Sequence, residues 1–231
     1  MPRDCAHDDL QASLASHGLN LRGGFAPVAA DGLPALPNGQ AAASVWMVGV
    51  IGSAFWPHFK ASPFFSDGQA DPLDRWSRAI GEELAARLGG LALFPFDGPP
   101  YHPFQRWADR AEPTQPSPMM LRIHPDHGLW HAYRFALALP VPLARQPVLE
   151  VAAGLCATCS GQPCLQACPV GAYTGEAFLL QACADHLHSS RGTDCMQSGC
   201  LARRACPVAP DQRYTPEHAA FHMQAFAKSH I

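Results

Sequence analysis

The spacing of apolar residues along the first two thirds of the chain predicts a mixture of helices and strands. In 71–88, apolar side chains recur every three or four positions and line one face of a helix, which the glycines at 89–90 would end. In 44–51, β-branched and aromatic residues follow one another without a break, which is typical of a buried strand. A short amphipathic helix is expected over 6–19, and 23–40 is predicted to be a loop because it is rich in glycine and proline.

Further strands are predicted on both sides of a proline-rich stretch. Residues 91–96 favour a strand, and 96–118 are predicted to form a long ordered loop of the kind often used for binding. Residues 120–123 and 130–139 favour two strands joined by a turn through 125–128. Near the end of the chain, Thr215 and the proline after it favour the start of a last helix.

Composition narrows the class of protein. With 231 residues, 48% of them hydrophobic and 15% charged, the chain has enough apolar material for one large domain or two small ones. The net charge of -3 gives no electrostatic argument for a nucleic-acid partner. The longest apolar stretch, 41–51, is far shorter than the roughly 20 residues that span a bilayer, and 1–10 lack the layout of a secretory signal. A cytoplasmic protein with no membrane partner is expected.

Cysteines in the last third carry the strongest chemical signal. They form two runs that each end in Cys-Pro, and the eight residues are Cys156, Cys159, Cys164, Cys168, Cys183, Cys195, Cys200 and Cys206. A loop that wraps one iron–sulfur cubane and sends its last thiolate to a neighbouring cluster has this form. By that crossover rule, Cys168 belongs to the second cluster and Cys206 returns to the first. The array therefore predicts two [4Fe-4S] clusters.

Structural zinc and a disulfide scaffold are the alternatives for this array. Zinc ribbons have paired CxxC knuckles, whereas the first run here is a triplet followed by Cys-Pro. Disulfides are rare in proteins that are not secreted. Cys5 stands apart from the array and is predicted to be a free thiol without a role.

The order of the cysteines resembles the C-terminal ferredoxin-like domain of epoxyqueuosine reductase and of reductive dehalogenases, which pass electrons from two [4Fe-4S] clusters to a cobalamin. The resemblance implies that Cys156, Cys159, Cys164 and Cys206 hold one cluster and that Cys168, Cys183, Cys195 and Cys200 hold the other. The spacings before Cys164, Cys200 and Cys206 are longer here than in that group. The glycine-rich segment that accompanies the catalytic acid of epoxyqueuosine reductase is not found, so tRNA modification is not expected.

The N-terminal two thirds is similar to the cytosolic cobalamin-processing chaperone (CblC-like). The similarity runs through VGVIGSAFWPHFKASPFF (48–65), DPLDRWSRAIGEEL (71–84) and LRIHPDHGLWHAYRFALALP (121–140). It implies an α+β fold with a flavodoxin-like or nitroreductase-like core whose sheet covers one face of the corrin. The expected division is a CblC-like, corrinoid-binding domain over 1–145, a ferredoxin-like dicluster domain over 148–212 and a C-terminal helix over 213–231, with a linker in 140–147.

A flat macrocycle would need aromatic and hydrogen-bonding side chains around it. The candidates for cofactor binding are Tyr101, His102, Phe104, Trp107, Trp130 and Arg134, and the alternative is that the aromatic residues pack on the core. Strand alternation would point Trp130 and Arg134 to one face and Tyr133 to the other. His124 is a candidate to ligate cobalt or donate a proton, and Asp97 is a candidate proton donor. A structural histidine and a solvated turn aspartate are the alternatives.

These patterns lead to three hypotheses about function. The first is an iron–sulfur oxidoreductase in which two [4Fe-4S] clusters relay electrons from a low-potential donor (a ferredoxin, a flavodoxin or a reductase) to a cobalamin. The second is a dicluster ferredoxin-type electron carrier without a corrinoid. The third is a flavin-linked, nitroreductase-like reductase.

Overall fold

The computed structural model describes residues 3–142 and 154–230, which divide into two compact units. Unit 1 contains residues 3–113 and 132–142, and unit 2 contains 114–131 and 154–230. The segment 114–131 thus packs with the cysteine region, although the sequence places it in the N-terminal domain. Most of the predicted linker, 140–147, and the predicted boundary beside it lie outside the described residues.

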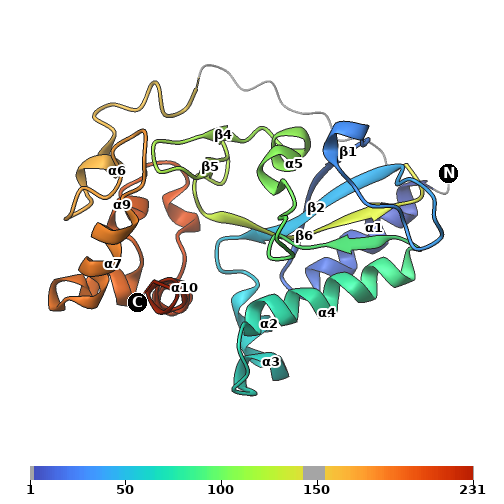
Figure 1. The fold of residues 1–231 in the computed structure, drawn as a ribbon, viewed down its shortest axis with the longest axis horizontal. Coiled ribbons are helices and arrows are strands. Elements are labelled where there is room, and N and C mark those ends of the chain that lie inside the picture. The colour runs from blue at the N-terminus through green and yellow to red at the C-terminus, as the bar shows by residue number, and fades with distance from the viewer. Residues whose placement is uncertain (1–2, 143–153, 231) are drawn as a thin grey trace. The chain divides into compact units, whose positions relative to one another are not determined.

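Unit 1 is built on a four-stranded sheet (Figure 1). In spatial order the strands are β1 (Asn20–Phe25), β2 (Ser44–Ile51), β6 (His131–Leu139) and β3 (Leu91–Leu93). The pairs β1–β2 and β3–β6 are antiparallel. Between β2 and β6, the Ala43 N–H donates to Leu139 O over 2.8 Å at one end, and a Cβ on Gly49 would lie 2.2 Å from Ala132 O at the other. These two strands therefore also run in opposite directions.

Helices cover both faces of this sheet. Figure 1 shows α5 on one side and α1 and α4 on the other. The helices of unit 1 are α1 (Arg3–Ala15), α2 (Trp56–Ala61), α3 (Pro63–Ser66), α4 (Pro72–Arg87) and α5 (Phe104–Ala111), with a 3-10 turn at Ala29–Asp31. Val45 and Met47 of β2 pack with Phe104 and Trp107 of α5 in one apolar cluster. The Trp107 indole N–H donates to Asp31 O over 3.2 Å, so its one polar atom is satisfied inside the core.

The sequence predicts some of these elements and misses others. The helix expected over 71–88 and the strand over 44–51 are confirmed as α4 and β2. The loop predicted for 96–118 is wrong in part, because it contains α5, whose buried residues recur at helical spacing behind Pro103. The loop predicted over 23–40 begins inside β1, where the glycines belong to a strand. A Cβ on Gly24 would lie 2.7 Å from the Trp46 ring, so close packing explains that glycine.

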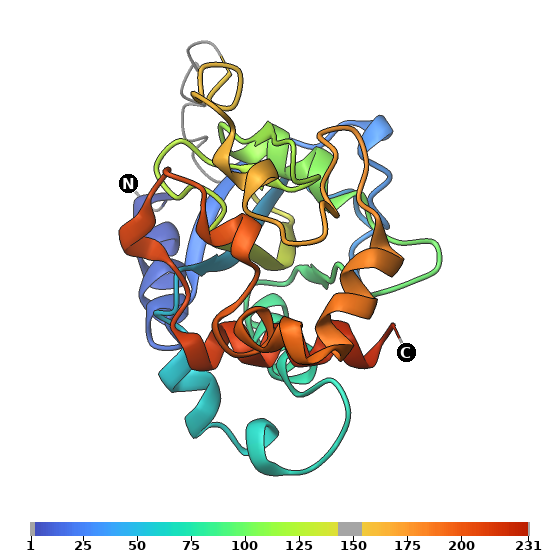
Figure 2. The ribbon, with the colours of Figure 1, turned by 90° about the vertical axis from the view of Figure 1, so that its left-hand side faces the viewer.

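The part of unit 2 over 154–230 consists of helices joined by loops (Figure 2, yellow to red), and the part over 114–131 holds two short strands. Its helices are α6 (Pro163–Gln166), α7 (Leu180–His188), α8 (Thr193–Ser198), α9 (Leu201–Arg204) and α10 (Pro216–Lys228), with 3-10 turns at Ser190–Gly192 and Pro210–Gln212. Helix α10 packs against α7 and α8. As the sequence predicts, Thr215 stands at the N-cap of α10 and a proline occupies its first turn.

The predicted hairpin between 120–123 and 130–139 is wrong. Strand β5 (Arg122–Ile123) pairs with β4 (Gln115–Pro116), whereas β6 belongs to the four-stranded sheet. The predicted turn itself is present, because His124 and Gly128 exchange two backbone hydrogen bonds of 2.9 and 2.8 Å. A turn sequence fixes the reversal of the chain, but the strand with which each arm pairs depends on the rest of the fold.

Across the described residues, the helices are too short or too polar for any of them to cross a membrane. The architecture is mixed α/β with a small antiparallel sheet, in agreement with the α+β class expected from the sequence.

Candidate functional site

Four cysteines of unit 2 form what we call the first thiol group: Cys156, Cys159, Cys164 and Cys206. Burial raises the pKa of Cys156, and the charges of the other three thiols raise it further. Burial also raises the pKa of Cys164, and the charges of Cys206 and Cys159 raise it further. The segment after α9 thus returns Cys206 to three thiols that lie 42 to 50 positions earlier in the chain.

The other four cysteines of the array form the second thiol group: Cys168, Cys183, Cys195 and Cys200. Burial raises the pKa of Cys183 to about 11, helped by the charges of Cys200, Cys168 and Cys195. Burial likewise raises the pKa of Cys200, and the charges of Cys195 and Cys168 raise it further. Helices α7 and α8 carry Cys183 and Cys195, and Cys200 lies directly before α9. The eight thiols therefore sort into two groups of four.

Backbone N–H groups point at several of these sulfur atoms. The Ala172 N–H donates to Cys168 Sγ over 3.2 Å. Other backbone groups lower the pKa of a nearby thiol and so oppose the effect of burial. These are Leu165 for Cys164, Ala202 and Arg203 for Cys200, and Val208 for Cys206. Hydrogen bonds of this kind stabilise a thiolate, which is the form that binds metals.

All eight cysteines are free thiols. Within 3–142 and 154–230, no three side chains of His, Cys, Asp or Glu are arranged to hold a single metal ion.

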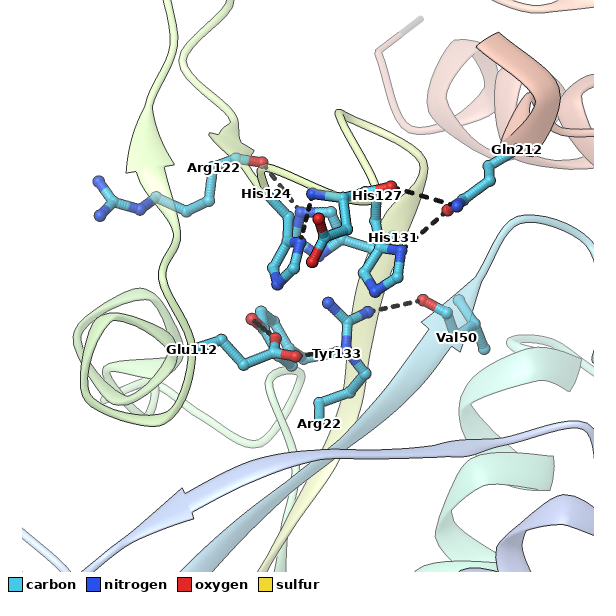
Figure 3. Close-up of polar contacts among 10 residues, drawn as sticks. Arg22, Val50, Glu112, Arg122, His124, His127, His131, Tyr133 and Gln212 are labelled. Atoms are coloured by element: carbon cyan, nitrogen blue, oxygen red, sulfur yellow. Dashed lines mark hydrogen bonds and ion pairs between the residues drawn. The ribbon is translucent and has the colours of Figure 1, made fainter. Parts of the chain in front are cut away.

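A buried polar cluster in unit 1 joins Arg22, Glu112 and Tyr133 (Figure 3). Arg22 is 2% exposed; its Nε donates to Glu112 Oε1 over 2.8 Å, and its Nη1 donates to Val50 O over 3.2 Å. The Tyr133 hydroxyl donates to Glu112 Oε2 over 2.6 Å. Burial raises the pKa of Tyr133, and the charge of Glu112 raises it further, so the phenol keeps its proton. Sequence reasoning missed Arg22 and Glu112, which come from β1 and from the residue that follows α5.

Three histidines of unit 2 lie at the turn after β5 and at the start of β6 (Figure 3). The His124 and His127 rings stack with centroids 4.4 Å apart, and His131 meets His124 edge-on at 6.0 Å. His124 Nδ1 accepts the Asp126 N–H over 3.0 Å, so this nitrogen carries no proton and the ring is the Nε2–H tautomer. His131 Nε2 donates to Arg122 O over 3.2 Å. Backbone bonds thus hold the His124 and His131 rings, and the His127 ring is held by the Gln212 side chain over 3.0 Å. The catalytic role of His124 stays a prediction.

The residues predicted to line a corrin are mostly packed inside their own units. Phe104 and Trp107 belong to the core beneath α5, and Trp130 is buried against Tyr214 with ring centroids 5.5 Å apart. The alternative interpretation, in which aromatic residues pack on the core, holds for these three. Tyr101 is 65% exposed, which leaves its ring accessible.

The remaining candidates of unit 1 are bound by neighbouring side chains. The His102 ring stacks on Trp107 with centroids 5.5 Å apart. Arg134 donates to Ser77 Oγ over 2.9 Å and to Asp74 Oδ1 over 2.6 Å, on the side of the sheet that α4 covers. Tyr133 turns toward α5, so these two neighbours point in opposite directions, as strand alternation predicts.

Asp97, the predicted proton donor, lies in the loop after β3 and forms an ion pair with Arg78. Arg78 also contacts Glu82 over 3.4 Å, and its guanidinium lies over the ring of Phe94. The carboxylate of Asp97 is partly exposed. Its contacts are those of a surface ion pair, and its proposed chemical role stays a prediction.

Comparison with known proteins gives one informative likeness. No protein-family model matches the chain, and no similar protein is found among curated proteins. A solved structure of selenomethionine-labelled epoxyqueuosine reductase matches with a TM-score of 0.50 at 15% identity, over 94% of this chain and 70% of that chain. The fold of the chain is similar to that of epoxyqueuosine reductase. A second structure, epoxyqueuosine reductase with an epoxyqueuosine-modified tRNA-Tyr stem loop, matches with a TM-score of 0.46 at 14% identity over the same shares.

The likeness to epoxyqueuosine reductase extends over both units, since 94% of the chain is covered. It agrees with the resemblance that the cysteine order implies. At 15% identity it concerns the fold alone, so the nitroreductase-like and ferredoxin-like descriptions of the two parts stay predictions.

Proposed function

We propose that this protein is an iron–sulfur oxidoreductase that holds one [4Fe-4S] cluster in each thiol group. The observation that carries the proposal is the sorting of eight thiols into two groups of four, in which Cys168 and Cys206 each join the group formed mainly by the other run. This is the crossover of two-cluster ferredoxins. The fold likeness to a reductase supports the same class of protein.

The donor set suits such clusters. Each group offers four thiols, and backbone N–H groups approach Cys164, Cys168, Cys200 and Cys206. Bound clusters would supply one-electron transfer at potentials that proteins tune between about -700 and +450 mV. The amide donors would stabilise the negative charge on the sulfur atoms, which raises the affinity for metal and favours reduction.

A cobalamin is the electron acceptor that we propose from the N-terminal sequence resemblance. The described side chains give it little support, because Phe104, Trp107 and Trp130 are buried and Arg134 is bound to Asp74. Tyr101 is the predicted lining residue whose ring remains exposed.

The burial of Phe104, Trp107 and Trp130 favours a second candidate function. In this function the protein is an electron carrier with the same two clusters and no corrinoid. In that function the sheet of unit 1 serves as a scaffold, and electrons leave to a partner protein. The two functions differ in whether cobalamin binds, so one preparation can distinguish them.

The experiment starts with anaerobic reconstitution of the full chain with iron and sulfide. We expect about eight iron and eight acid-labile sulfur atoms per chain, and about four of each in Cys195→Ser. Cys5→Ser is the matched control, since Cys5 lies outside the array, and it should equal the wild type. About four iron atoms in the wild type would contradict the second cluster.

Cobalamin is then added to the chemically reduced, reconstituted protein. A change in the corrin absorbance that requires both clusters would support the corrinoid reductase. Full cluster loading with no change in the corrin spectrum would favour the carrier. Flavin absorbance in protein purified from cells would favour the flavin-linked reductase instead.

A further inference from the structure

Gln115 of β4 lies beside the loop that carries the first cysteines of the first thiol group. Its Oε1 accepts the Leu155 N–H over 3.1 Å, and Leu155 directly precedes Cys156. A Cβ on Gly154 would lie 3.3 Å from the same oxygen. The chain therefore passes close to the Gln115 amide immediately before it reaches Cys156.

Strand pairing places the Gln115 side chain on the face that packs with the thiols. Gln115 stands opposite Ile123 of β5, and residues directly opposite each other in an antiparallel pair project from the same face. Ile123 is 1% exposed and packs in an apolar cluster with Leu155. The cysteines of that cluster are Cys156, Cys164 and Cys206 of the first group and Cys168 and Cys200 of the second. The bond to Leu155 puts the amide of Gln115 at the first group.

The amide of Gln115 has one satisfied end and one unsatisfied end. Because the Leu155 N–H is a donor, the atom that faces it is the amide oxygen, and this fixes the orientation of the carboxamide. Nε2 is buried, and the described part of the chain holds no acceptor for it. A buried N–H group without an acceptor costs free energy, so folded proteins usually supply one. Gln115 thus presents an oriented N–H donor beside the first thiol group.

We propose that the Gln115 Nε2–H group donates a hydrogen bond to a sulfur atom of the cluster in the first thiol group and raises the reduction potential of that cluster. This inference rests on the proposed function. When a low-potential donor gives the cluster one electron, negative charge is added to it and no covalent bond forms or breaks. A hydrogen bond to sulfur is stronger when the sulfur carries more negative charge, so the donor favours the reduced state.

Gln166 provides the matched control. It lies two positions beyond Cys164, but its side chain is exposed and its Nε2 donates to Gly161 O over 2.7 Å. This amide already has an acceptor within the protein. Gln115→Met and Gln166→Met each replace an amide by an apolar side chain of similar length. A difference between the two variants therefore reports on the donor at Gln115.

The test is an EPR-monitored redox titration of the full-length, reconstituted protein. Iron and sulfide counts on every variant show whether the clusters are present, and Cys206→Ser, which lacks one ligand of the first group, identifies the signal of the first cluster. In Gln115→Met we expect the reduced-to-oxidised ratio of that cluster at a fixed potential to fall about tenfold, equivalent to about 59 mV for one electron. Gln166→Met should stay close to the wild type, and the second cluster should change less than the first.

An unchanged midpoint of the first cluster in Gln115→Met, or an equal shift in Gln166→Met, would overturn the inference and leave the proposed function standing. Absence of clusters from the wild type would overturn the proposed function itself.

A spectroscopic measurement decides the question even if Gln115→Met fails to assemble the first cluster. Gln166→Met is prepared with ¹⁵N in its glutamine side chains, reconstituted and reduced, and studied by pulsed EPR. We expect a ¹⁵N coupling to the first cluster, from the Gln115 amide. Without that coupling the inference is rejected, and the bond from the Leu155 N–H to Gln115 Oε1 would explain a loss of the cluster in Gln115→Met.

Discussion

Arg22 and Glu112 form a buried ion pair in unit 1, with Nε and Oε1 2.8 Å apart and side-chain exposures of 1% and 11%. The second carboxylate oxygen accepts the Tyr133 hydroxyl, so one carboxylate satisfies two buried donors from neighbouring segments. The pair thus connects β1, β6 and the end of α5. Removal of one partner from such a pair leaves an uncompensated buried charge, which costs more than the pair contributes when it is intact.

We therefore expect Glu112→Gln to lower the free energy of unfolding by about 3–5 kcal/mol, measured by urea denaturation. Glu82→Gln is the matched control, because Glu82 is 59% exposed and contacts Arg78 over 3.4 Å. It should change the free energy of unfolding by less than about 1 kcal/mol. Equal losses in both variants would show that Arg22 is not buried as the structure has it.

Gly128 allows the turn that carries His124 and His127 to approach the segment after Cys206. Its φ is +55°, and a Cβ there would lie 2.4 Å from Val208 O. Gly128→Ala should destabilise unit 2 by more than about 2 kcal/mol, through backbone strain and the forced displacement of a main-chain atom. The loss should include iron from the proposed first cluster, because the backbone of Val208 is close enough to Cys206 to lower the pKa of that thiol.

Gly171→Ala provides the comparison for Gly128→Ala. Gly171 has a similar φ of +58°, but an added Cβ meets nothing within 4 Å. Its replacement should cost about 1 kcal/mol from backbone conformation alone. Thermal unfolding measures both variants, and a loss in Gly171→Ala as large as that in Gly128→Ala would contradict the close approach to Val208.

The sequence predicts well where one local pattern decides the structure. Helix α4 and strand β2 have a single apolar periodicity, and nothing in their sequence competes with it. In α5 the same periodicity is present, but the prolines on either side of it favour a loop, which the sequence analysis therefore predicts. The crossover of Cys168 and Cys206 is predicted because Cys-Pro spacing carries the information locally.

Long-range pairing has no such local signal. Arg22 and Glu112 are 90 positions apart, and neither is unusual in its own segment. The aromatic residues at Phe104 and Trp107 show the opposite difficulty, since a ring that lines a ligand and a ring that fills a core have the same sequence pattern. Only the packing of α5 on the sheet distinguishes the two.

His17 makes part of the stability of unit 1 depend on pH. Burial lowers its pKa below the usual value of 6.5, the charge of Glu83 opposes this, and His58 lowers it further. In the window between the folded pKa and about 6.5, the unfolded chain binds more protons than the folded chain. The free energy of unfolding should therefore fall as pH falls through that window, and His17→Gln should weaken this dependence.

NMR titration of the His17 ring measures the same effect directly. Glu83→Gln removes the charge that raises the pKa of His17, so the His17 midpoint should move to lower pH. His58→Gln should move it to higher pH. Shifts with the opposite signs would contradict the placement of His17 between these two side chains.

The crossover of the cysteines predicts that Cys164 and Cys168, although close in the sequence, are ligands of different clusters. Cys164 lies in α6 and Cys168 directly beyond the end of that helix. The charge of Cys206 nevertheless raises the pKa of Cys164, whereas the charge of Cys168 raises the pKa of Cys183. A local arrangement, in which the first run holds one cluster by itself, would place both in the same site. Pairs of serine substitutions distinguish the two arrangements by the iron that remains.

With the crossover, Cys164→Ser/Cys168→Ser removes a ligand from each group, so iron should fall from about eight atoms per chain to near zero. Cys164→Ser/Cys206→Ser removes two ligands from the first group alone, so about four iron atoms should remain. The local arrangement predicts the reverse for the two double variants. Because both carry two substitutions in the same unit, a general loss of stability cannot produce the difference between them, and the iron count assigns Cys168 and Cys206 to their groups.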